Sequence, residues 1–157
     1  MAEIYLTRAG YEKLRTELEY LKTTKRREIS KAIGEARAQG DISENAEYDA
    51  AKDAQGHCEA RIVELEEKLS NVRIIEDMSI PSDKVYIGAK VTLKDLASGD
   101  QVQYMLVSAE EADYEHNKLS IVSPIGRGLM GKAVDQEVEI EAPAGNLSYR
   151  IIKIERP

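Results

Sequence analysis

The sequence predicts an α+β protein in which a long helical hairpin is followed by a small mixed-sheet domain. Three observations support this prediction. Apolar residues recur at helical spacing as far as residue 76, no proline interrupts residues 8–76, and the apolar period changes to two after a linker at residues 77–83. We therefore expect two domains, residues 1–77 and residues 78–157.

The first predicted helix carries an apolar stripe with one irregular step. The stripe consists of Leu14, Leu18, Leu21, Ile29, Ile33 and Ala36. Polar Lys25 falls in the wide gap between Leu21 and Ile29. Gly40 suits the position just after the helix end, because glycine readily adopts the left-handed conformation that is common there.

The second predicted helix carries a more regular, heptad-like stripe. Its members are Ala51, Ala54, Cys58, Ile62, Leu65, Leu69 and Val72. Asp41 or Ser43 is the expected N-cap, because short polar side chains satisfy the free N–H groups of a first turn. Each helix would be about 45 Å long at about 1.5 Å per residue. Two such helices joined by a few residues fold back as an antiparallel coiled coil.

The second half of the chain has the period of β-strands. Candidate strands occupy residues 85–87, 89–94, 101–108, 118–123, 137–142 and 148–154. Turn residues separate them, including Gly88, Gly99 and Gly145. About 75 residues are enough for a modest apolar core, so we expect a small mixed sheet.

The composition narrows the class of protein. The net charge of −7, from 22 Lys and Arg against 29 Asp and Glu, gives no overall basic field for nucleic acid or membrane. The lone Cys58 excludes an internal disulfide and fits a reducing cytosol. No apolar run approaches the length of about 20 residues that spans a bilayer. We expect a cytoplasmic protein without a membrane partner.

The charge is divided unevenly between the two predicted helices. Residues 8–39 hold nine bases and five acids, whereas residues 41–77 hold eleven acids and four bases. One interpretation is that the flanks of the two helices attract each other. The alternative is a basic stripe along the first helix that tracks a phosphate backbone.

The sequence Asp41-Ile42-Ser43-Glu44 places two acids at the start of the second helix. Such a pattern has the form of a capping box. The same two carboxylates, about 4.5 Å apart along a helix axis, also suit one Mg²⁺, which prefers oxygen ligands. Two acids are too few for a tight site, so a catalytic ion held here would need ligands from another macromolecule.

Two other patterns carry little functional weight. Residues 126–131 match G-x-G-x-x-G, but the sequence predicts no crossover helix after them, as a dinucleotide site requires. His57, Cys58 and His116 are too sparse for zinc, and Cys58 lies on the apolar stripe. We expect a packed thiol and a glycine-rich packing element.

Four segments together resemble one known family. They are G-D-I-S-E-N-A-E-Y-D-A-A-K at residues 40–52, Q-G-H-C-E-A-R-I at 55–62, K-L-S-N at 68–71 and S-P-I-G-R-G-L-M-G-K at 123–132. In this order they resemble the bacterial GreA-type transcription elongation (transcript-cleavage) factors, the Gre family, over essentially the whole chain. The resemblance implies an N-terminal antiparallel coiled coil and a C-terminal FKBP-like domain.

The resemblance also implies a function and a partner. Such a factor binds bacterial RNA polymerase, inserts its coiled coil through the secondary channel and stimulates the Mg²⁺-dependent cleavage of backtracked nascent RNA near its 3′ end. It is an accessory factor, with no activity expected alone, and we expect a monomer.

The family motif assigns roles to residues at both ends of the molecule. Asp41 and Glu44 become the acids that hold a second Mg²⁺ jointly with the polymerase. Arg37 and Lys52 become contacts to RNA phosphate or polymerase. The segment Ser123, Pro124 and Ile125 becomes part of the polymerase-docking surface.

Two other functions stay open at this stage. The first is a coiled-coil interaction protein whose tip acts only as a wedge in a channel. The second is a peptidyl-prolyl isomerase, suggested by the FKBP-like resemblance. An isomerase of that type wants an aromatic-lined pocket, which a domain without Phe or Trp supplies poorly. Its aromatic residues are Tyr86, Tyr104, Tyr114 and Tyr149.

Overall fold

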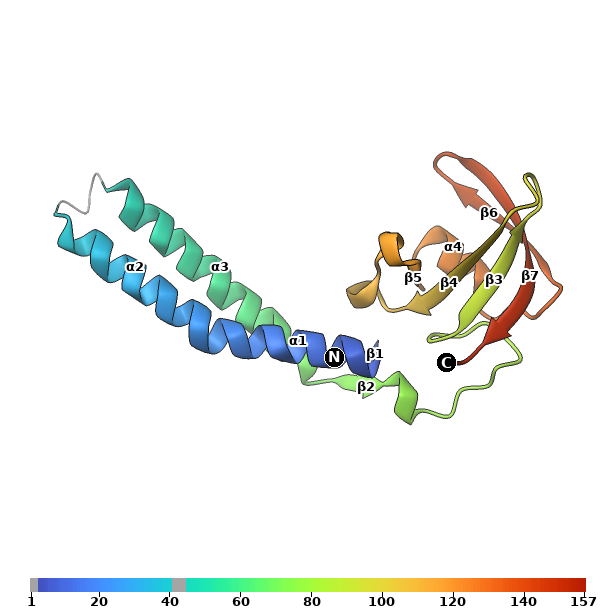
Figure 1. Cartoon of the computed structure of the whole chain (residues 1–157), viewed down its shortest axis with the longest axis horizontal. Helices are drawn as coiled ribbons and strands as arrows, with labels where there is room; N and C mark the ends of the chain where they lie inside the picture. The colour runs from blue at the N-terminus through green and yellow to red at the C-terminus, as the bar shows by residue number, and fades with distance from the viewer. Residues whose placement is uncertain (1–2, 41–44) are drawn as a thin grey trace. The chain divides into compact units, whose positions relative to one another are not determined.

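The computed structural model describes residues 3–40 and 45–157, and it confirms the predicted α+β class (Figure 1). Contacts divide these residues into two compact units, residues 11–72 and residues 3–10 together with 73–157. We call them the hairpin unit and the sheet unit. The division differs from the predicted one, which placed residues 1–10 and 73–77 with the hairpin.

The first helical arm consists of α1 (Arg8–Tyr20), a π-helical turn (Leu21–Lys25) and α2 (Arg26–Ala38). In the π-helical turn the Arg26 N–H donates to the Leu21 carbonyl, five residues earlier. Such a turn takes up one extra residue, which explains the irregular step in the sequence. Leu21 and Ile29 thereby pack in the same apolar cluster, with Lys25 half-buried between them.

The second arm is α3 (Ala46–Leu69), which lies beside α2 in Figure 1. The two arms meet in a narrow apolar seam, and the predicted stripes are confirmed. Ile29, Cys58 and Ile62 are buried together, with half-buried Leu18, Leu21, Ile33 and Ala54 packed around them. Ala36, Ala51 and Leu65 are also buried.

The end of α2 is as predicted, whereas the start of α3 differs from the prediction. Gly40 follows α2 with a φ of +117°, in the region that favours glycine. The N-cap of α3, however, is Asn45. The prediction of Asp41 or Ser43 was wrong because the helix begins later than the sequence pattern indicates.

The sheet unit is built on a five-stranded sheet. Its strands are β3 (Lys90–Asp95), β4 (Gln101–Val107), β5 (Lys118–Ser120), β6 (Glu137–Ala142) and β7 (Gly145–Glu155). They lie in the order β5-β4-β3-β7-β6, and all neighbours are antiparallel except β4 and β5. The predicted mixed sheet is confirmed.

Short elements complete the described chain. The strands β1 (Ile4–Leu6) and β2 (Val72–Ile74) form a second, two-stranded sheet. Three 3₁₀ turns cover Ile75–Asp77, Ala109–Glu111 and Tyr114–His116. The helix α4 (Pro124–Leu129) follows β5. No helix among the described residues is both long and apolar enough to cross a membrane.

Two of the predicted strands need correction. Residues 85–87 are not a strand, because Val85 bonds to the backbone of Lys132 and Gly131, and the chain then turns at Gly88, where φ is +86°. The strand predicted for residues 118–123 ends at Ser120. There a tight turn leads into α4, a helix that the sequence did not predict.

The core of the sheet unit is larger than the hairpin seam. Its buried residues come from the sheet, α4 and the segment before β3: Val85, Ala89, Val91, Leu93, Leu106, Leu119, Leu129, Val138, Ile140, Tyr149 and Ile151. Gly128 lies against this core, because a Cβ there would come within 2.9 Å of Ile140 Cγ1. The G-x-G-x-x-G segment is thus a packing element, as predicted.

Candidate functional site

The tip of the hairpin contains four of the residues that the sequence assigns to function. Arg37 lies in the last turn of α2, and Lys52 lies on α3. Asp41 and Glu44 lie outside the described residues. The geometry of the tip therefore has to be built from the residues on either side of them.

Asn45 closes the tip with two hydrogen bonds in opposite directions. Its Oδ1 accepts from the Tyr48 N–H at 3.0 Å, which caps α3, and its Nδ2 donates to the Ala36 carbonyl at 2.7 Å, near the end of α2. One side chain thus satisfies a free N–H of α3 and binds a carbonyl in the last turn of α2, which also accepts from the Gln39 N–H at 3.3 Å. Asn45 therefore links the end of α2 to the start of α3, on either side of residues 41–44.

A second contact joins the same two helix ends. The Arg37 guanidinium lies over the Tyr48 ring, 5.9 Å from its centroid, within the range of a cation–π interaction. A guanidinium in this position keeps N–H donors that can bind an acceptor. Arg37 is therefore both part of the tip structure and a cation exposed to solvent.

Lys52 is a second exposed cation near the tip, on α3. Its ammonium group donates to Gln55 Oε1 at 2.8 Å, one turn further along the exposed side of α3. Glu47 and Asp49, in the first turn of α3, complement the positive end of the helix dipole. The described residues contain no group of three or more His, Cys, Asp or Glu placed to hold a metal ion.

The position of Asn45 bears on the capping interpretation of the D-x-x-E pattern. A capping box would have placed Asp41 at the N-cap and Glu44 three residues into the helix. In the structure these positions belong to Asn45 and Tyr48. The N-cap of α3 is thus Asn45 and not Asp41.

Asn45 and Tyr48 were missed by the sequence reasoning, although a signal was present. Asparagine is as good an N-cap as aspartate, and Glu47 and Asp49 give acids in the turn that follows. Asp41 drew attention because a glycine precedes it. The helix start lies at Asn45, after both predicted caps, Asp41 and Ser43.

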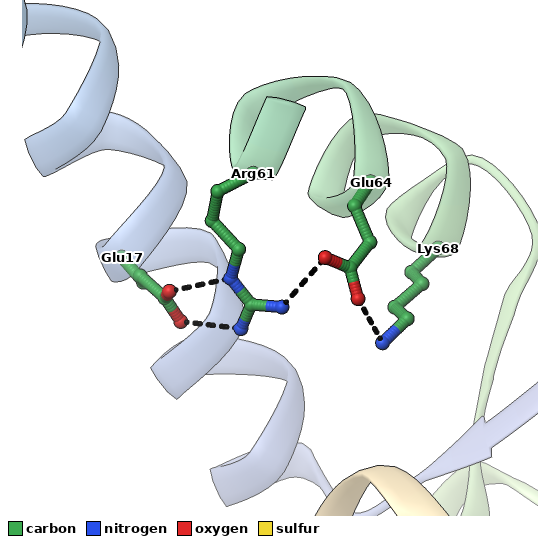
Figure 2. Close-up of polar contacts among 4 residues, drawn as sticks. All are labelled: Glu17, Arg61, Glu64 and Lys68. Atoms are coloured by element: carbon green, nitrogen blue, oxygen red, sulfur yellow. Dashed lines mark hydrogen bonds and ion pairs between the residues drawn. The ribbon is translucent and has the colours of Figure 1, made fainter. Parts of the chain in front are cut away.

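Ion pairs run along the flanks of the hairpin, as one interpretation of the charge division predicted. Arg26 binds Glu59 through two hydrogen bonds of 2.8 Å. Figure 2 shows a second set, in which Arg61 binds Glu17 at 2.8 and 3.1 Å and also approaches Glu64 at 3.2 Å. This second pair runs opposite to the overall charge division, since its base is on α3.

These contacts shift the ionisation of the groups involved. The hydrogen bond from Arg26 lowers the pKa of Glu59. Lys68, 3.0 Å away, and then Arg61 lower the pKa of Glu64. The hydrogen bond to Glu17 raises the pKa of Arg61. Each shift favours the charged form because the partner bears the opposite charge.

The alternative interpretation, a basic stripe along the first helical arm that binds phosphate, is also supported. Lys22 and Arg27 are exposed and lie beside a shallow depression with Thr23, Arg26 and Ser30. Within residues 3–40 and 45–157, neither Lys22 nor Arg27 pairs with a carboxylate. The hairpin therefore combines paired flanks with cations that are free for a partner.

The predicted docking segment is a rigid turn at the start of α4. Ser123 caps the helix by accepting from the Gly126 N–H at 3.1 Å, and its hydroxyl donates to the Ser120 carbonyl at 2.6 Å. A Cβ on Gly126 would lie 2.0 Å from that carbonyl oxygen, so the turn requires glycine. Pro124 is exposed and Ile125 packs against the core.

A further apolar residue stands on the same turn. Val122 is 61% exposed, although its N–H donates to Ser120 Oγ at 3.1 Å. The turn thus holds Val122 and Pro124 toward solvent with little freedom to rearrange. Sequence reasoning named the neighbouring residues and missed Val122, because exposure of a single valine cannot be read from the pattern.

Comparisons with known proteins agree with both halves of this description. The family model described as "Transcription elongation factor, N-terminal" matches residues 4–74, and the one described as "Transcription elongation factor, GreA/GreB, C-term" matches residues 80–156. A protein named Transcription elongation factor GreA from Chloroherpeton thalassium is 49% identical over 150 residues, which cover 96% of this chain and 95% of that protein.

Two further relatives span the chain from end to end. The protein of the same name from Chlorobium phaeobacteroides is 50% identical over 152 residues, covering 96% of both chains. Among solved structures, GreA factor homolog 1 (Gfh1) of Thermus thermophilus is 31% identical, covering 98% of this chain and 99% of that chain, with a TM-score of 0.42. The chain belongs to the GreA/GreB family of transcription elongation factors.

Proposed function

We propose that this chain is a transcription elongation factor that binds bacterial RNA polymerase and rescues arrested complexes. It inserts the hairpin through the secondary channel and stimulates the polymerase's own cleavage of backtracked nascent RNA. Family membership supports the elongation role. The observation that carries the cleavage role is the cap at Asn45, because α3 begins there and does not take Asp41 as its N-cap.

Asp41 and Glu44 are the proposed ligands of a Mg²⁺ ion shared with the polymerase. Their carboxylate oxygens are of the type that Mg²⁺ prefers, and two of them leave most of its positions to other ligands. When bound, the ion supplies positive charge that activates water and stabilises the phosphodiester oxygens as the bond breaks. A donor set this small fits an activity that exists only in complex with the polymerase.

Arg37 and Lys52 supply positive charge beside these acids. Arg37 lies over Tyr48 and is exposed to solvent, and Lys52 is exposed on α3. Two cations at fixed positions suit the phosphates at the 3′ end of the nascent RNA. Neither residue transfers a proton in this proposal; both orient the RNA or the polymerase surface.

The turn that contains Ser123, Pro124 and Ile125 is the proposed docking surface of the sheet unit. The Ser123 hydroxyl donates one hydrogen bond to the Ser120 carbonyl and accepts one from the Gly126 N–H, and these bonds and the close approach of Gly126 fix this turn. Binding to a rigid turn costs little conformational entropy. We include Val122 in the docking surface, because the same turn holds it exposed.

The isomerase alternative receives no support from the tyrosines of the sheet unit. Tyr149 is buried in the core, with 7% of its surface exposed, whereas Tyr114 is 61% exposed. These two side chains therefore do not line a common apolar pocket. A proline-peptide isomerisation assay on the full chain, with activity well above the uncatalysed rate, would restore this alternative.

The proposed function is tested on a stalled elongation complex that contains backtracked RNA. RNA cleavage is followed with and without the chain while the Mg²⁺ concentration is varied. We expect the chain to accelerate cleavage and to lower the Mg²⁺ concentration that half-maximal cleavage requires. The control contains chain, RNA and Mg²⁺ without polymerase. Robust cleavage in that control would contradict the shared site.

A further inference from the structure

The sheet unit contains a pocket of about 340 Å³ that the proposed function does not use. Its walls include Ile75, Gly88, Met105, Lys118 and Arg156, and all of its lining residues belong to the sheet unit. The volume is at the lower end of the range of about 300–1,000 Å³ that is typical of small-molecule sites. The pocket shares no lining residue with the proposed docking turn, so a separate ligand has to be considered.

Arg156 is fixed at one wall of this pocket. Its Nη1 donates to the Ile87 carbonyl at 2.9 Å, and the side chain is half-buried. The guanidinium lies against Gly88, where a Cβ would come within 3.3 Å of Arg156 Nη2. Among the described residues, no acceptor binds Nη2 or Nε of Arg156. These two nitrogens present parallel N–H groups, which match two oxygens of a phosphate or carboxylate.

Lys118 brings a second cation to the same pocket. It lies on β5 opposite Met105 of β4, and its side chain is half-buried. Within residues 3–40 and 45–157, no hydrogen bond or ion pair occupies its ammonium group. A cation that is partly removed from water and has no partner gains from the approach of an anion.

The carboxylates around the pocket already have donors. Glu76, which lines the pocket, accepts from the first backbone N–H of α1 at 2.9 Å. Glu111 accepts two hydrogen bonds from Thr7, which is another lining residue. Glu155 pairs with Lys153 at 2.6 Å. Donors without an acceptor therefore remain at Lys118 and Arg156, and an incoming anion can bind them.

The rest of the pocket wall is largely apolar. Ile75 is buried, and Met105 is half-buried beside Lys118. Methionine sulfur packs favourably against aromatic rings, and its flexible side chain adapts to their shape. A neighbouring depression shares Met105 and Lys118 with the pocket and adds the polar side chains of Lys90 and Gln103. The site thus offers cations for an oxyanion and an apolar wall for the body that carries it.

We propose that this pocket binds a small phosphate monoester with a flat, apolar body, such as a nucleoside monophosphate. The phosphate lies between the Nε–Nη2 edge of Arg156 and the Lys118 ammonium group, and the body packs on Met105 and Ile75. Two cations favour a phosphate monoester, with a charge of about −1.5 to −2 at pH 7, over a carboxylate with a single charge. The inference does not rest on the proposed function, because it involves only the pocket in the sheet unit.

Binding is measured by isothermal titration calorimetry on the full chain with three probes: adenosine 5′-monophosphate (AMP), adenosine and inorganic phosphate. We expect saturable binding of AMP, with about tenfold weaker binding or more for adenosine, which lacks the charged acceptor. Inorganic phosphate should also bind more weakly than AMP, because it lacks the body that covers the apolar wall. The affinity for AMP should fall as the salt concentration rises.

Three results with the parent chain would overturn the proposal. The first is the absence of saturable AMP binding up to about 10 mM. The second is an equal affinity for AMP and adenosine, which would mean that the phosphate is not recognised. The third is an equal affinity for AMP and inorganic phosphate, which would mean that the apolar wall does not contribute.

Substitutions locate the binding site. Lys118→Gln removes one cation and should weaken AMP binding by about tenfold or more. Arg156→Lys keeps the charge but loses the paired N–H groups, so it should weaken binding severalfold. The matched control is Lys94→Gln, which changes the charge equally at another half-buried lysine of the sheet, outside the pocket lining. The control should bind AMP as the parent chain does.

Thermal unfolding without ligand shows whether each variant is folded. Arg156→Lys also alters the bond to the Ile87 carbonyl, so the comparison of Lys118→Gln with Lys94→Gln decides the outcome. Parent-like affinity for AMP in Lys118→Gln would overturn the proposal. An equal loss of affinity in Lys118→Gln and Lys94→Gln would also overturn it, because the effect would then reflect overall charge and not this pocket.

Discussion

The hairpin unit and the sheet unit are stabilised in different ways. The hairpin has one narrow seam, in which Ile29, Cys58 and Ile62 are buried and most neighbours are only half-buried. Ion pairs on its flanks add to that seam. The sheet unit has a continuous core of residues that are almost fully buried. The hairpin unit has little interior, so its stability is local, whereas the sheet unit is stabilised as a whole.

The largest expected effect comes from truncating the core of the sheet unit. Leu93→Ala, at a residue with no exposed surface, should lower the free energy of unfolding by about 2–5 kcal/mol, through lost burial and the cavity left behind. Ile62→Ala in the seam should lie at the low end of that range, because two helices can close together over the gap. Urea denaturation followed by circular dichroism measures both. A larger loss for Ile62→Ala would contradict the comparison.

Glycine-to-alanine substitutions should have opposite signs in the two units. Gly126→Ala places a Cβ 2.0 Å from the Ser120 carbonyl oxygen, and such overpacking should cost about 1–3 kcal/mol. Gly34→Ala, with open space around the new Cβ, should stabilise α2 by about 1 kcal/mol through helix propensity. The midpoints of urea denaturation give both signs. Two substitutions of the same sign would mean that the packing around one of these glycines is misassigned.

The two hydrogen bonds of Asn45 at the tip should contribute less to the free energy of unfolding than the core of the sheet unit does. They should contribute more than any ion pair on the flanks of the hairpin. Asn45→Ala removes the cap of α3 and the bond to the Ala36 carbonyl, which should cost about 1–2 kcal/mol. Asn45→Ser retains a capping oxygen and should lose only part of this. The exchange rate of the Tyr48 amide reports the cap directly. Equal protection of that amide in the parent and in Asn45→Ala would rule the cap out.

The smallest expected effect is the pH dependence of the hairpin. The pKa values of Glu59 and Glu64 lie below their ordinary value of 4.5 in the folded chain. The unfolded chain therefore binds protons more readily, and the stabilisation is fully present above pH 4.5 and is lost as the pH falls below it. Thermal unfolding from pH 7 to pH 3 measures the loss. Glu59→Gln should show a shallower decline, and an identical decline in both chains would contradict the assignment.

Much of the fold was predictable because periodicity reports burial directly. The α3 stripe from Ala51 to Val72 and the strands around β3, β4, β6 and β7 follow the pattern closely. The irregular step at Lys25 was visible, but its cause, a π-helical turn, depends on backbone bonds that a pattern does not contain. Residues 85–87 failed as a strand because a turn at Gly88 redirects the chain.

The sequence identified which residue types lie at the candidate site, but it predicted the structure around them only in part. Arg37 and Lys52 were found at the tip because charge and sequence position mark them. The Asn45 cap was missed, since two plausible caps precede the same helix. Long-range contacts were beyond the reach of the sequence: Thr7 donates two hydrogen bonds to Glu111 across 104 positions, and only the fold brings these residues together.

In the proposed function, Asp41 and Glu44 act chemically, through Mg²⁺, and do not merely shape the tip. The variant that carries Asp41→Asn and Glu44→Gln separates these two roles, because it keeps the size of both side chains. Binding to the stalled polymerase complex and Mg²⁺-dependent RNA cleavage are measured side by side. We predict that binding survives while the stimulation of cleavage collapses. Loss of both together, or of neither, would contradict the account.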